Sequence, residues 1–535
     1  MPILNPILPG FHPDPSILRV GDDYYIAAST FEWWPGVPVY HSRDLVHWQF
    51  LAHVLTKTTQ LDLRGVPDSA GVWAPSLSFA DGKFWLVYTV VRNTGGGRPF
   101  KDLHNYLVTA DRIKGPWSDP VYLNASGFDP SLFHDDDGRK WLVQMRWDFR
   151  PDKPRFAGII LQEFEAAANR LIGEVHTLLK KDRLIEGPNL YKRNGWYYLM
   201  LAEGGTAWNH GISMARSRCI TGPYELDPQD LVLTSRDNET LPLQKAGHGE
   251  LVETPQAEWY LAHLAARPMG LGQQRRCVLG RETCLQKVVW TADGWLRLAQ
   301  GGHHASIEVE APRDAERMSA APCSGGHDFS AAELQPGWLS LRGPVAESWC
   351  SLRERPGWLR LRGRESLHSF FEQSLLVRRL VDFGWRAETW LQFEPRNFNQ
   401  SAGLIVWYDT RTHFYLRVTR ADDGTLELGV ALTDDGVYAE SLEARRIVES
   451  GDVLLCATGE GRELRFFFAK PGQSWQPVGG VFDLSKISDD YGSVLHFTGG
   501  TVGLCVQDLD GTMTAADFGF FNLQRLASSY SQGCA

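Results

Sequence analysis

The sequence predicts an all-β chain of 535 residues in which a five-bladed β-propeller is followed by a β-sandwich. A short turn rich in proline and acidic residues precedes an aromatic strand five times within the first 260 residues. The second aromatic residues of these strands lie 60, 56, 57 and 62 residues apart, at Tyr25, Trp85, Trp141, Tyr198 and Tyr260. Helical periodicity is nearly absent. A repeat of this length built from short strands is typical of a propeller with one blade per repeat.

Each repeat begins with a turn that leads into its first strand. The five turns are Asp14-Pro15-Ser16, Ala74-Pro75-Ser76, Asp129-Pro130-Ser131, Glu186-Gly187-Pro188 and the degraded His248-Gly249-Glu250. Hairpin dipeptides such as Asp81-Gly82 and Asn194-Gly195 then precede the aromatic strands. Because equivalent positions of all blades converge on the axis of a propeller, Asp14, Asp129 and Glu186 are expected to face one pocket.

The repeat ends before a second region with a different pattern. Residues 311–336 are rich in Pro, Ala, Ser and charged residues, a composition typical of a linker. Strand alternation then resumes, for example in residues 402–408 and 414–418, without a repeat of the earlier length. Such short strands indicate a sandwich. We therefore expect a propeller domain in residues 1–322 and a sandwich domain in residues 323–535.

Composition narrows the classes of partner and compartment. The formal net charge of −10 disfavours nucleic acid and membrane surfaces, which attract clustered Lys and Arg. No apolar run reaches the ~18 residues that a membrane-spanning helix needs. The first residues lack the pattern of a secretory signal, and the eight cysteines show no paired zinc-binding spacing, so a cytoplasmic protein with reduced thiols is expected.

Three carboxyls in one pocket are suited to the hydrolysis of sugar acetals, which uses one protonated and one ionised carboxyl. Burial and like-charge repulsion would separate their pKa values, so that one carboxyl stays protonated near neutral pH. An isolated Asp-Pro-Ser is most often an ordinary turn. Three acids in corresponding repeats favour function instead, and no G-x-S-x-G or H-E-x-x-H motif offers a rival chemistry.

Four segments together resemble glycoside hydrolase family 43, and most closely its two-domain β-xylosidases: residues 10–16, 72–76, 128–133 and 185–188. The resemblance extends to residues 496–499 in the second region. It implies that Asp14 is the general base that activates water and Glu186 the general acid. Asp129 would hold the sugar and keep the pKa of the acid raised. The family inverts the anomeric centre, which requires carboxyls ~6.5–9.5 Å apart.

The resemblance also implies substrate contacts around the three acids. Arg281 would donate to sugar hydroxyls or to Asp129, the alternative being a solvent-facing arginine. His248 would close the pocket floor or reach a central ion through water, the alternative being a buried core histidine. The apolar walls would come from Phe31, Trp73 and Trp147, which could equally fill the sheet core.

The resemblance further implies that Phe497 reaches from the second domain and caps the pocket entrance, so that this domain contributes to the active-site entrance of the catalytic propeller. A linker of ~25 residues is short enough for this. The sandwich would then belong to the active site rather than act as an independent sugar-binding module. No metal ion is required for catalysis by two carboxyls, although a structural calcium ion in the propeller channel near His248 is compatible with the pattern.

The resulting prediction is an exo-acting, inverting β-1,4-xylosidase that releases xylose from the non-reducing end of short xylo-oligosaccharides, with α-L-arabinofuranosidase side activity. The alternatives are an enzyme that is mainly an α-L-arabinofuranosidase and a sugar-binding propeller without catalysis. A retaining fructofuranosidase is a further competitor, but it would begin with Asp-Pro-Asn rather than Asp14-Pro15-Ser16. The sequence leaves open whether the chain is a monomer or a homo-oligomer, such as a dimer or tetramer.

Overall fold

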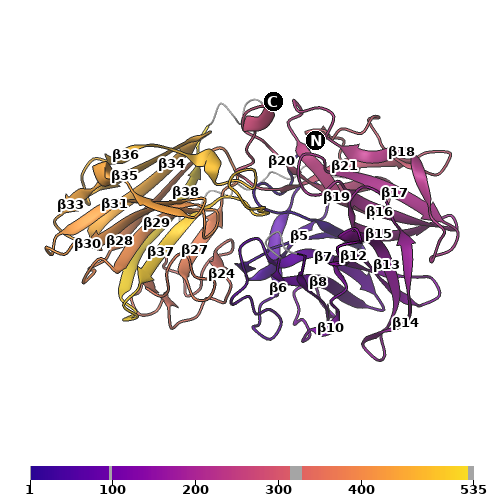
Figure 1. Cartoon of the computed structure of the whole chain (residues 1–535), viewed down its shortest axis with the longest axis horizontal. Coiled ribbons are helices and arrows are strands. Elements are labelled where there is room, and N and C mark those ends of the chain that lie inside the picture. Colours follow the sequence, from indigo (N-terminus) through magenta and orange to yellow (C-terminus); the bar gives the residue numbers. More distant parts are fainter. Residues whose placement is uncertain (1, 95–98, 314–327, 528–535) are drawn as a thin grey trace. The chain divides into compact units, whose positions relative to one another are not determined.

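The computed structural model describes residues 2–94, 99–313 and 328–527 and divides into two compact units (Figure 1). The first comprises residues 1–62, 69–267 and 281–320, and the second comprises residues 63–68, 268–280 and 321–535. Within the described residues, helix is limited to three short 3₁₀ turns, η1 (Gly272–Gln274), η2 (Leu442–Ala444) and η3 (Leu484–Lys486). The predicted domain boundary at residue 322 lies outside the described residues.

The first unit contains five antiparallel sheets of four strands in its described residues. In chain order the sheets are β2 (Ser16–Val20), β3 (Asp23–Ala27), β5 (Gly36–Ser42), β6 (Gln49–Leu55); β7 (Gly71–Ala80), β8 (Lys83–Asn93), β9 (Asp102–Ala110), β10 (Val121–Asn124); β11 (Gly127–His134), β12 (Lys140–Trp147), β13 (Phe156–Glu165), β14 (Arg170–Leu179); β15 (Ile185–Arg193), β16 (Trp196–Glu203), β17 (Gly211–Ser217), β18 (Glu225–Thr234); β19 (Gln244–Glu253), β20 (Trp259–Ala266), β21 (Glu282–Trp290), β22 (Leu296–Leu298). The short β4 (Trp33–Trp34) lies between β3 and β5 in the sequence.

The five sheets close into a ring. The first strands β2, β7, β11, β15 and β19 contact one another in this order, and β19 contacts β2. β1 (Ile3–Leu4) also pairs with β23 (Glu308–Val309), joining the two ends of the ring. The Asn5 side chain strengthens this closure by donating to Leu285 O at 2.7 Å and accepting from Leu285 N at 2.8 Å. The predicted all-β fold with a five-bladed propeller is therefore confirmed.

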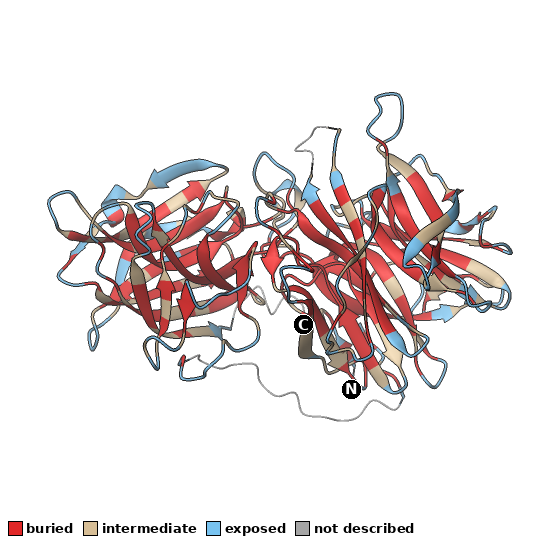
Figure 2. Ribbon diagram, turned by 90° about the horizontal axis from the view of Figure 1, so that it is seen from below, coloured by how far each residue is buried: buried red, intermediate tan, exposed pale blue. Residues whose placement is uncertain are grey.

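The repeated aromatic residues fill the spaces between blades. Trp85 packs with Leu142 and Phe164 of the next blade, and Tyr260 packs with Ile17 and Ile26 of the first. Most strands are buried over much of their length, whereas many of the connecting loops are exposed (Figure 2). Burial of a large aromatic side chain contributes about 1.5–3 kcal/mol, so the repeated aromatics stabilise the ring of blades.

The described residues of the second unit form two antiparallel sheets. One has the order β32 (Val437–Glu440), β31 (Leu426–Asp434), β30 (His413–Arg420), β29 (Gln400–Trp407), β37 (Thr501–Asp508), β27 (Ser374–Arg379), β24 (Leu339–Leu341), with β33 (Arg446–Val448) also paired to β31. The other has the order β25 (Cys350–Ser351), β26 (Leu359–Arg362), β38 (Ala515–Arg525), β28 (Gly384–Gln392), β34 (Asp452–Glu460), β35 (Glu463–Ala469), β36 (Gln476–Asp483). One apolar core includes Leu404 and Leu416 of the first sheet and Leu455 and Phe518 of the second, confirming the sandwich.

Two segments from the first half of the chain complete this sandwich. Met269, Val278 and Leu279 belong to its apolar core. The Asp68 carboxylate lies 2.6 Å from the Nη2 atom of Arg342, whose side chain is fully buried. Residues 63–68 and 268–280 therefore belong structurally to the second unit, although they precede it in the sequence.

No helix in residues 2–94, 99–313 and 328–527 has the length and apolar character that crossing a membrane requires.

Candidate active site

A shared backbone distortion places one residue of every blade at the central channel. All five residues have left-handed φ angles: Asp14 (53°), Ala74 (32°), Asp129 (54°), Gly187 (53°) and His248 (45°). This conformation is strained for residues other than glycine. The pairing register of β7, β11, β15 and β19 is irregular at this point. Bulges of this kind redirect side chains and are common beside active sites.

Glu186 comes one residue earlier in its blade than Asp14 and Asp129 do in theirs. Gly187 holds the position that Asp14 and Asp129 hold in their blades. A Cβ atom on Gly187 would lie 3.0 Å from the His248 ring, so the packing of the two blades favours glycine there. The Gly187 N–H instead donates to Asp129 Oδ2 at 3.1 Å. Glu186 therefore presents its carboxyl from the preceding residue of β15.

Asp14 is a buried, ionised carboxylate. Its Oδ2 atom accepts a hydrogen bond from Ser29 Oγ at 2.6 Å, and its Oδ1 atom accepts one from Arg281 Nη1 at 2.9 Å. Burial alone would raise the pKa of Asp14, but the charge of Arg281 and then that of His248 outweigh this effect. The pKa of Asp14 therefore lies below its ordinary value, as a general base requires.

Glu186 has the opposite electrostatic environment. Burial and the negative charge of Asp14 raise its pKa to about 7. The charges of Arg281 and Lys101 oppose this increase only in part. Glu186 consequently keeps a proton at pH values at which an ordinary glutamic acid would have lost it, as a general acid requires.

Asp129 is buried beside the other two acids. Burial, and then the charges of Glu186 and Asp14, raise its pKa well above the ordinary value. The hydrogen bond from Gly187 N–H acts in the other direction. Because the charges of these carboxyls shift one another's pKa values, the three carboxyls lie in one site, as the repeat predicts from the sequence.

Aromatic rings lie next to this site. Phe31 is 2% exposed, and its ring centroid lies 6.0 Å from that of Trp73. Lys101 Nζ lies 5.6 Å from the Trp73 ring centroid and 4.8 Å from that of the half-buried Trp147. Arg281 is also within 5.5 Å of the Phe31 ring centroid. The structure thus brings the three predicted wall residues into the surroundings of the acids.

Two polar residues of the site have no sequence signal that predicts them. Ser29 donates a hydrogen bond to Asp14, but it follows β3 and lies outside every repeated motif. Lys101 influences the pKa of Glu186 from the segment just before β9, whereas Lys153 in the corresponding loop of the next blade is exposed. Ser29 and Lys101 both come from loops, which vary between repeats more than strands do.

In four of the blades, the residue two positions after the channel residue joins neighbouring blades. Its hydrogen bonds are Leu77 N to Ser16 Oγ (2.8 Å), Ser131 Oγ to Pro188 O (2.6 Å), Asn189 Nδ2 to Gly249 O (3.3 Å) and Ile17 N to Glu250 Oε2 (2.8 Å). Burial raises the pKa of Glu250 to about 8. The serines of the Asp-Pro-Ser turns therefore hold neighbouring blades together.

His248 lies at the channel, with Nδ1 3.9 Å from Asp14 Oδ1. Burial lowers the pKa of its ring, although the charge of Asp14 opposes this. A cavity of about 10 Å³ lies beside it, which is at the lower limit for one water molecule. Two groups of described residues have metal-ligand atoms close enough to share an ion: Asp237, His303, His304 and Cys277, Asp489, Asp490. Neither includes His248, and the channel calcium stays a prediction.

Phe497 is partly buried in the segment that precedes β37 of the second unit. Its predicted contact with the pocket depends on how the two units are placed and stays a prediction.

A five-bladed propeller that holds an ionised and a protonated carboxyl in one buried site is the arrangement of a glycoside hydrolase. Residues 3–296 match the model for Glycosyl hydrolases family 43, and the chain belongs to this family. Residues 326–524 match the Beta xylosidase C-terminal Concanavalin A-like domain. The resemblance noted in the sequence is thereby confirmed.

Several relatives are similar over their whole length. The crystal structure of a xylan β-1,4-xylosidase from Bacillus halodurans C-125 is 51% identical, with a TM-score of 0.95, covering 98% of this chain and 100% of that one. Xylosidase/arabinosidase 43B from Humicola insolens is 47% identical over 97% of both chains. A xylan 1,3-β-xylosidase from a Vibrio species is 42% identical over 97% of this chain and 98% of its own.

Proposed function

We propose that the chain is an exo-acting, inverting β-1,4-xylosidase that releases xylose from the non-reducing end of short xylo-oligosaccharides. The observation that carries this proposal is the opposite shift of two pKa values in one buried site. The pKa of Asp14 is lowered, whereas that of Glu186 is raised to about 7. The identity of 51% to a xylan β-1,4-xylosidase supports the substrate class.

In the proposed reaction, Asp14 accepts a proton from water as the water oxygen attacks the anomeric carbon. Glu186 gives its proton to the leaving glycosidic oxygen as the bond from that oxygen to the anomeric carbon breaks. Attack from the opposite side inverts the anomeric centre. Arg281 holds the Asp14 carboxylate in position through its 2.9 Å hydrogen bond. Asp129 binds the sugar and, when ionised, opposes ionisation of Glu186.

The aromatic walls favour a pentose over a hexose. Xylose lacks the hydroxymethyl group that glucose carries at C6. Phe31 and Trp73 are almost fully buried, at 2% and 8% exposure, so these side chains have little freedom to move aside. A close-packed apolar wall rejects a larger substituent by steric overlap. Discrimination between xylose and glucose would then need no polar contact.

The stereochemistry of the product tests the mechanism. Hydrolysis of β-1,4-xylobiose is followed by proton NMR before mutarotation, and α-xylose is expected as the first product. Initial release of β-xylose would refute inversion. Asp14→Ala and Glu186→Ala should each reduce turnover by about 10³-fold. For Glu186→Ala, an aryl β-xyloside with a good leaving group should be much less affected, because its departure needs little protonation.

The alternative is an enzyme that mainly cleaves α-L-arabinofuranosides. The observation in its support is the 47% identity to a xylosidase/arabinosidase. The two are separated by kcat/KM for 4-nitrophenyl β-D-xyloside and 4-nitrophenyl α-L-arabinofuranoside. A higher value for the xyloside is expected, with the arabinofuranoside as a side activity. Parallel assays on β-1,3- and β-1,4-xylobiose decide the linkage, and preference for the β-1,3 isomer would overturn that part of the proposal.

We also infer that the enzyme acts in the cytoplasm. The six cysteines among the described residues are all free thiols, which suits a reducing compartment: Cys219, Cys277, Cys284, Cys350, Cys456 and Cys505. Cell fractionation tests this inference. Light scattering of the purified chain distinguishes a monomer from the dimer or tetramer that the sequence leaves open.

A further inference from the structure

The sandwich carries a pocket of its own, with a volume of about 490 Å³, on the face of β29–β31 and β37 that points away from its core. The alternation along β30 explains how one strand serves both faces. Phe414, Leu416 and Val418 belong to the apolar core, whereas Tyr415, Arg417 and Thr419 line the pocket. Successive residues of a strand point to opposite faces, so the pocket is a surface of polar and apolar groups built on a rigid sheet.

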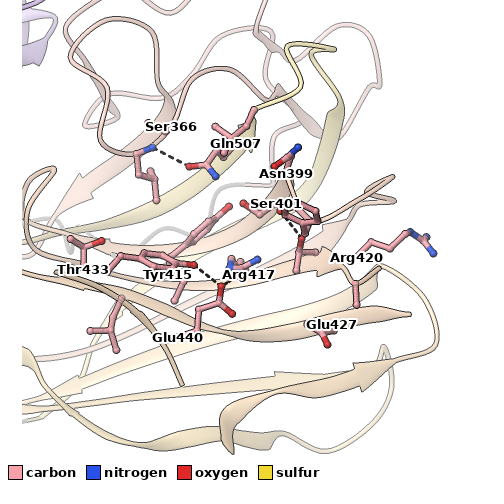
Figure 3. Close-up of a pocket in the computed structure, with 18 of the residues that line it drawn as sticks. Ser366, Asn399, Ser401, Tyr415, Arg417, Arg420, Glu427, Thr433, Glu440 and Gln507 are labelled. Carbon is pink, nitrogen blue, oxygen red and sulfur yellow. Dashed lines mark hydrogen bonds and ion pairs between the residues drawn. The ribbon is translucent and has the colours of Figure 1, made fainter. Parts of the chain in front are cut away.

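Hydrogen bonds hold the pocket lining in place (Figure 3). Arg417 Nη2 donates to Glu440 Oε1 at 2.6 Å, and Tyr438 Oη donates to the same oxygen at 2.6 Å. The loop at Leu367 is fixed by its N–H, which donates to Gln507 Oε1 at 3.1 Å. The Gln507 amide NH₂ donates to no residue in the described part of the chain, which leaves it for a ligand.

The charges of the pocket lining balance. The lining contains three arginines and three carboxylates, namely Arg417, Arg420, Arg445 and Asp422, Glu427, Glu440. Burial lowers the pKa of His413 to about 4, so this histidine adds no charge at neutral pH. Sites for phosphate and other anions have an excess of positive groups. A balanced polar lining suits a neutral ligand with many hydroxyl groups.

Two exposed aromatic rings complete the lining. Phe398 is 62% exposed and Tyr438 is 55% exposed, and both line the pocket. Sugars present apolar C–H faces, which pack on aromatic rings, and hydroxyl groups, which bond to polar side chains. The volume also falls in the range of about 300–1,000 Å³ that is common for small-molecule sites.

We propose that this pocket binds a short β-1,4-linked xylo-oligosaccharide at a second, non-catalytic site. Every residue that lines it belongs to the second unit, and none belongs to the carboxyl site of the propeller. This departs from the expectation that the sandwich is no sugar-binding module. The saccharide class follows from the pocket itself, whereas the choice of xylose rests on the proposed function.

The experiment measures binding of xylotriose by isothermal titration calorimetry to the full-length Asp14→Asn chain, which prevents hydrolysis during the titration. Two sites are expected. Adding Phe398→Ala and Tyr438→Ala should remove one site, or weaken it at least tenfold, and leave the other unchanged. Phe371→Ala is the matched control, because Phe371 is 57% exposed in the same unit but does not line the pocket.

A second variant, Arg417→Lys, keeps the charge opposite Glu440 but removes the planar donor fork, and it should also weaken the second site. A single site in every variant would overturn the proposal, as would equal binding of inorganic phosphate at the pocket. Binding of cellotriose but not xylotriose would overturn the ligand. Hydrolysis of 4-nitrophenyl β-D-xyloside, measured without the Asp14 change, should be unaffected by Phe398→Ala and Tyr438→Ala. Absence of hydrolysis in the unaltered chain would count against the proposed function and not against the pocket.

Discussion

Replacing Glu186 with Gln should abolish hydrolysis of xylobiose and stabilise the fold at alkaline pH. Burial and the charge of Asp14 raise the pKa of Glu186 to about 7 from the ordinary 4.5. The folded chain therefore keeps a proton that the unfolded chain releases between these two pH values. The free energy of unfolding falls as the pH rises through this window and this contribution is lost above about pH 7.

The size of the effect follows from the two pKa values. Their difference, 7 − 4.5 = 2.5, at about 1.36 kcal/mol per pKa unit, gives about 3 kcal/mol. Gln has the shape of protonated Glu but does not ionise, so Glu186→Gln avoids this loss. The change also removes a charge that raises the pKa of Asp129, which acts in the same direction. The variant should match the wild type near pH 4.5 and exceed it at pH 8.

The assay is thermal unfolding of both chains at pH 4.5 and pH 8, followed by circular dichroism. A stabilisation of about 3 kcal/mol corresponds to a rise of roughly 3–5 °C at pH 8. Glu174→Gln is the matched control, because Glu174 is exposed on β14 and should show no such dependence on pH. An equal difference between wild type and Glu186→Gln at both pH values would refute the reasoning, because burial would then not be destabilising the ionised carboxyl.

Three further predictions concern the site and its support. The value of kcat/KM should fall above about pH 7, as Glu186 ionises, and also below the ordinary pKa range of Asp, as Asp14 gains a proton. Arg281→Met should move this acid limb of the pH profile to higher pH, because the Arg281 charge lowers the pKa of Asp14. An unmoved acid limb would contradict the role of Arg281. Treatment with a chelator should leave turnover intact, because two carboxyls suffice for the reaction. A complete loss of turnover that added metal reverses, with no change in melting temperature, would show a catalytic ion. Asp68→Ala should destabilise the second unit by about 3–5 kcal/mol, because it leaves buried Arg342 without its carboxylate. Glu449→Ala, which breaks the exposed pair with Lys470, is the control and should change little.

Repetition made the propeller and its acids predictable from the sequence. Each blade must fill the same space with aromatic residues and must turn its first strand at the same point. Trp85 therefore has an aromatic counterpart in each of the other blades, and Asp129 has a counterpart at the same point of each turn. The repeat does not single out Lys101, because the corresponding loop of the next blade also carries a lysine, Lys153, which is exposed and pairs with Asp152. The proximity of Lys101 to Trp147 arises only when the chain is folded.

The division into units shows a second limit. Residues 268–280 lie between two strands of the last blade, and composition alone assigns them to the propeller. Their apolar side chains, Met269, Val278 and Leu279, are nevertheless buried in the sandwich core. Cys277 N is bonded there to Ser488 Oγ and Asp490 Oδ2, each at 3.0 Å. Such an excursion depends on contacts distant in the sequence, which local patterns do not contain.

The repeated turns account for both the stability of the propeller and its chemistry. Three carboxyls buried together repel one another, and the left-handed φ angles of Asp14 and Asp129 add strain. The cost has to be offset by interactions that exist only when neighbouring blades pack together. The third residue of the same turns supplies them, since Ser16, Ser131 and Glu250 bond to neighbouring blades. Each turn thus directs one side chain into the site and uses another to hold the ring that keeps it there.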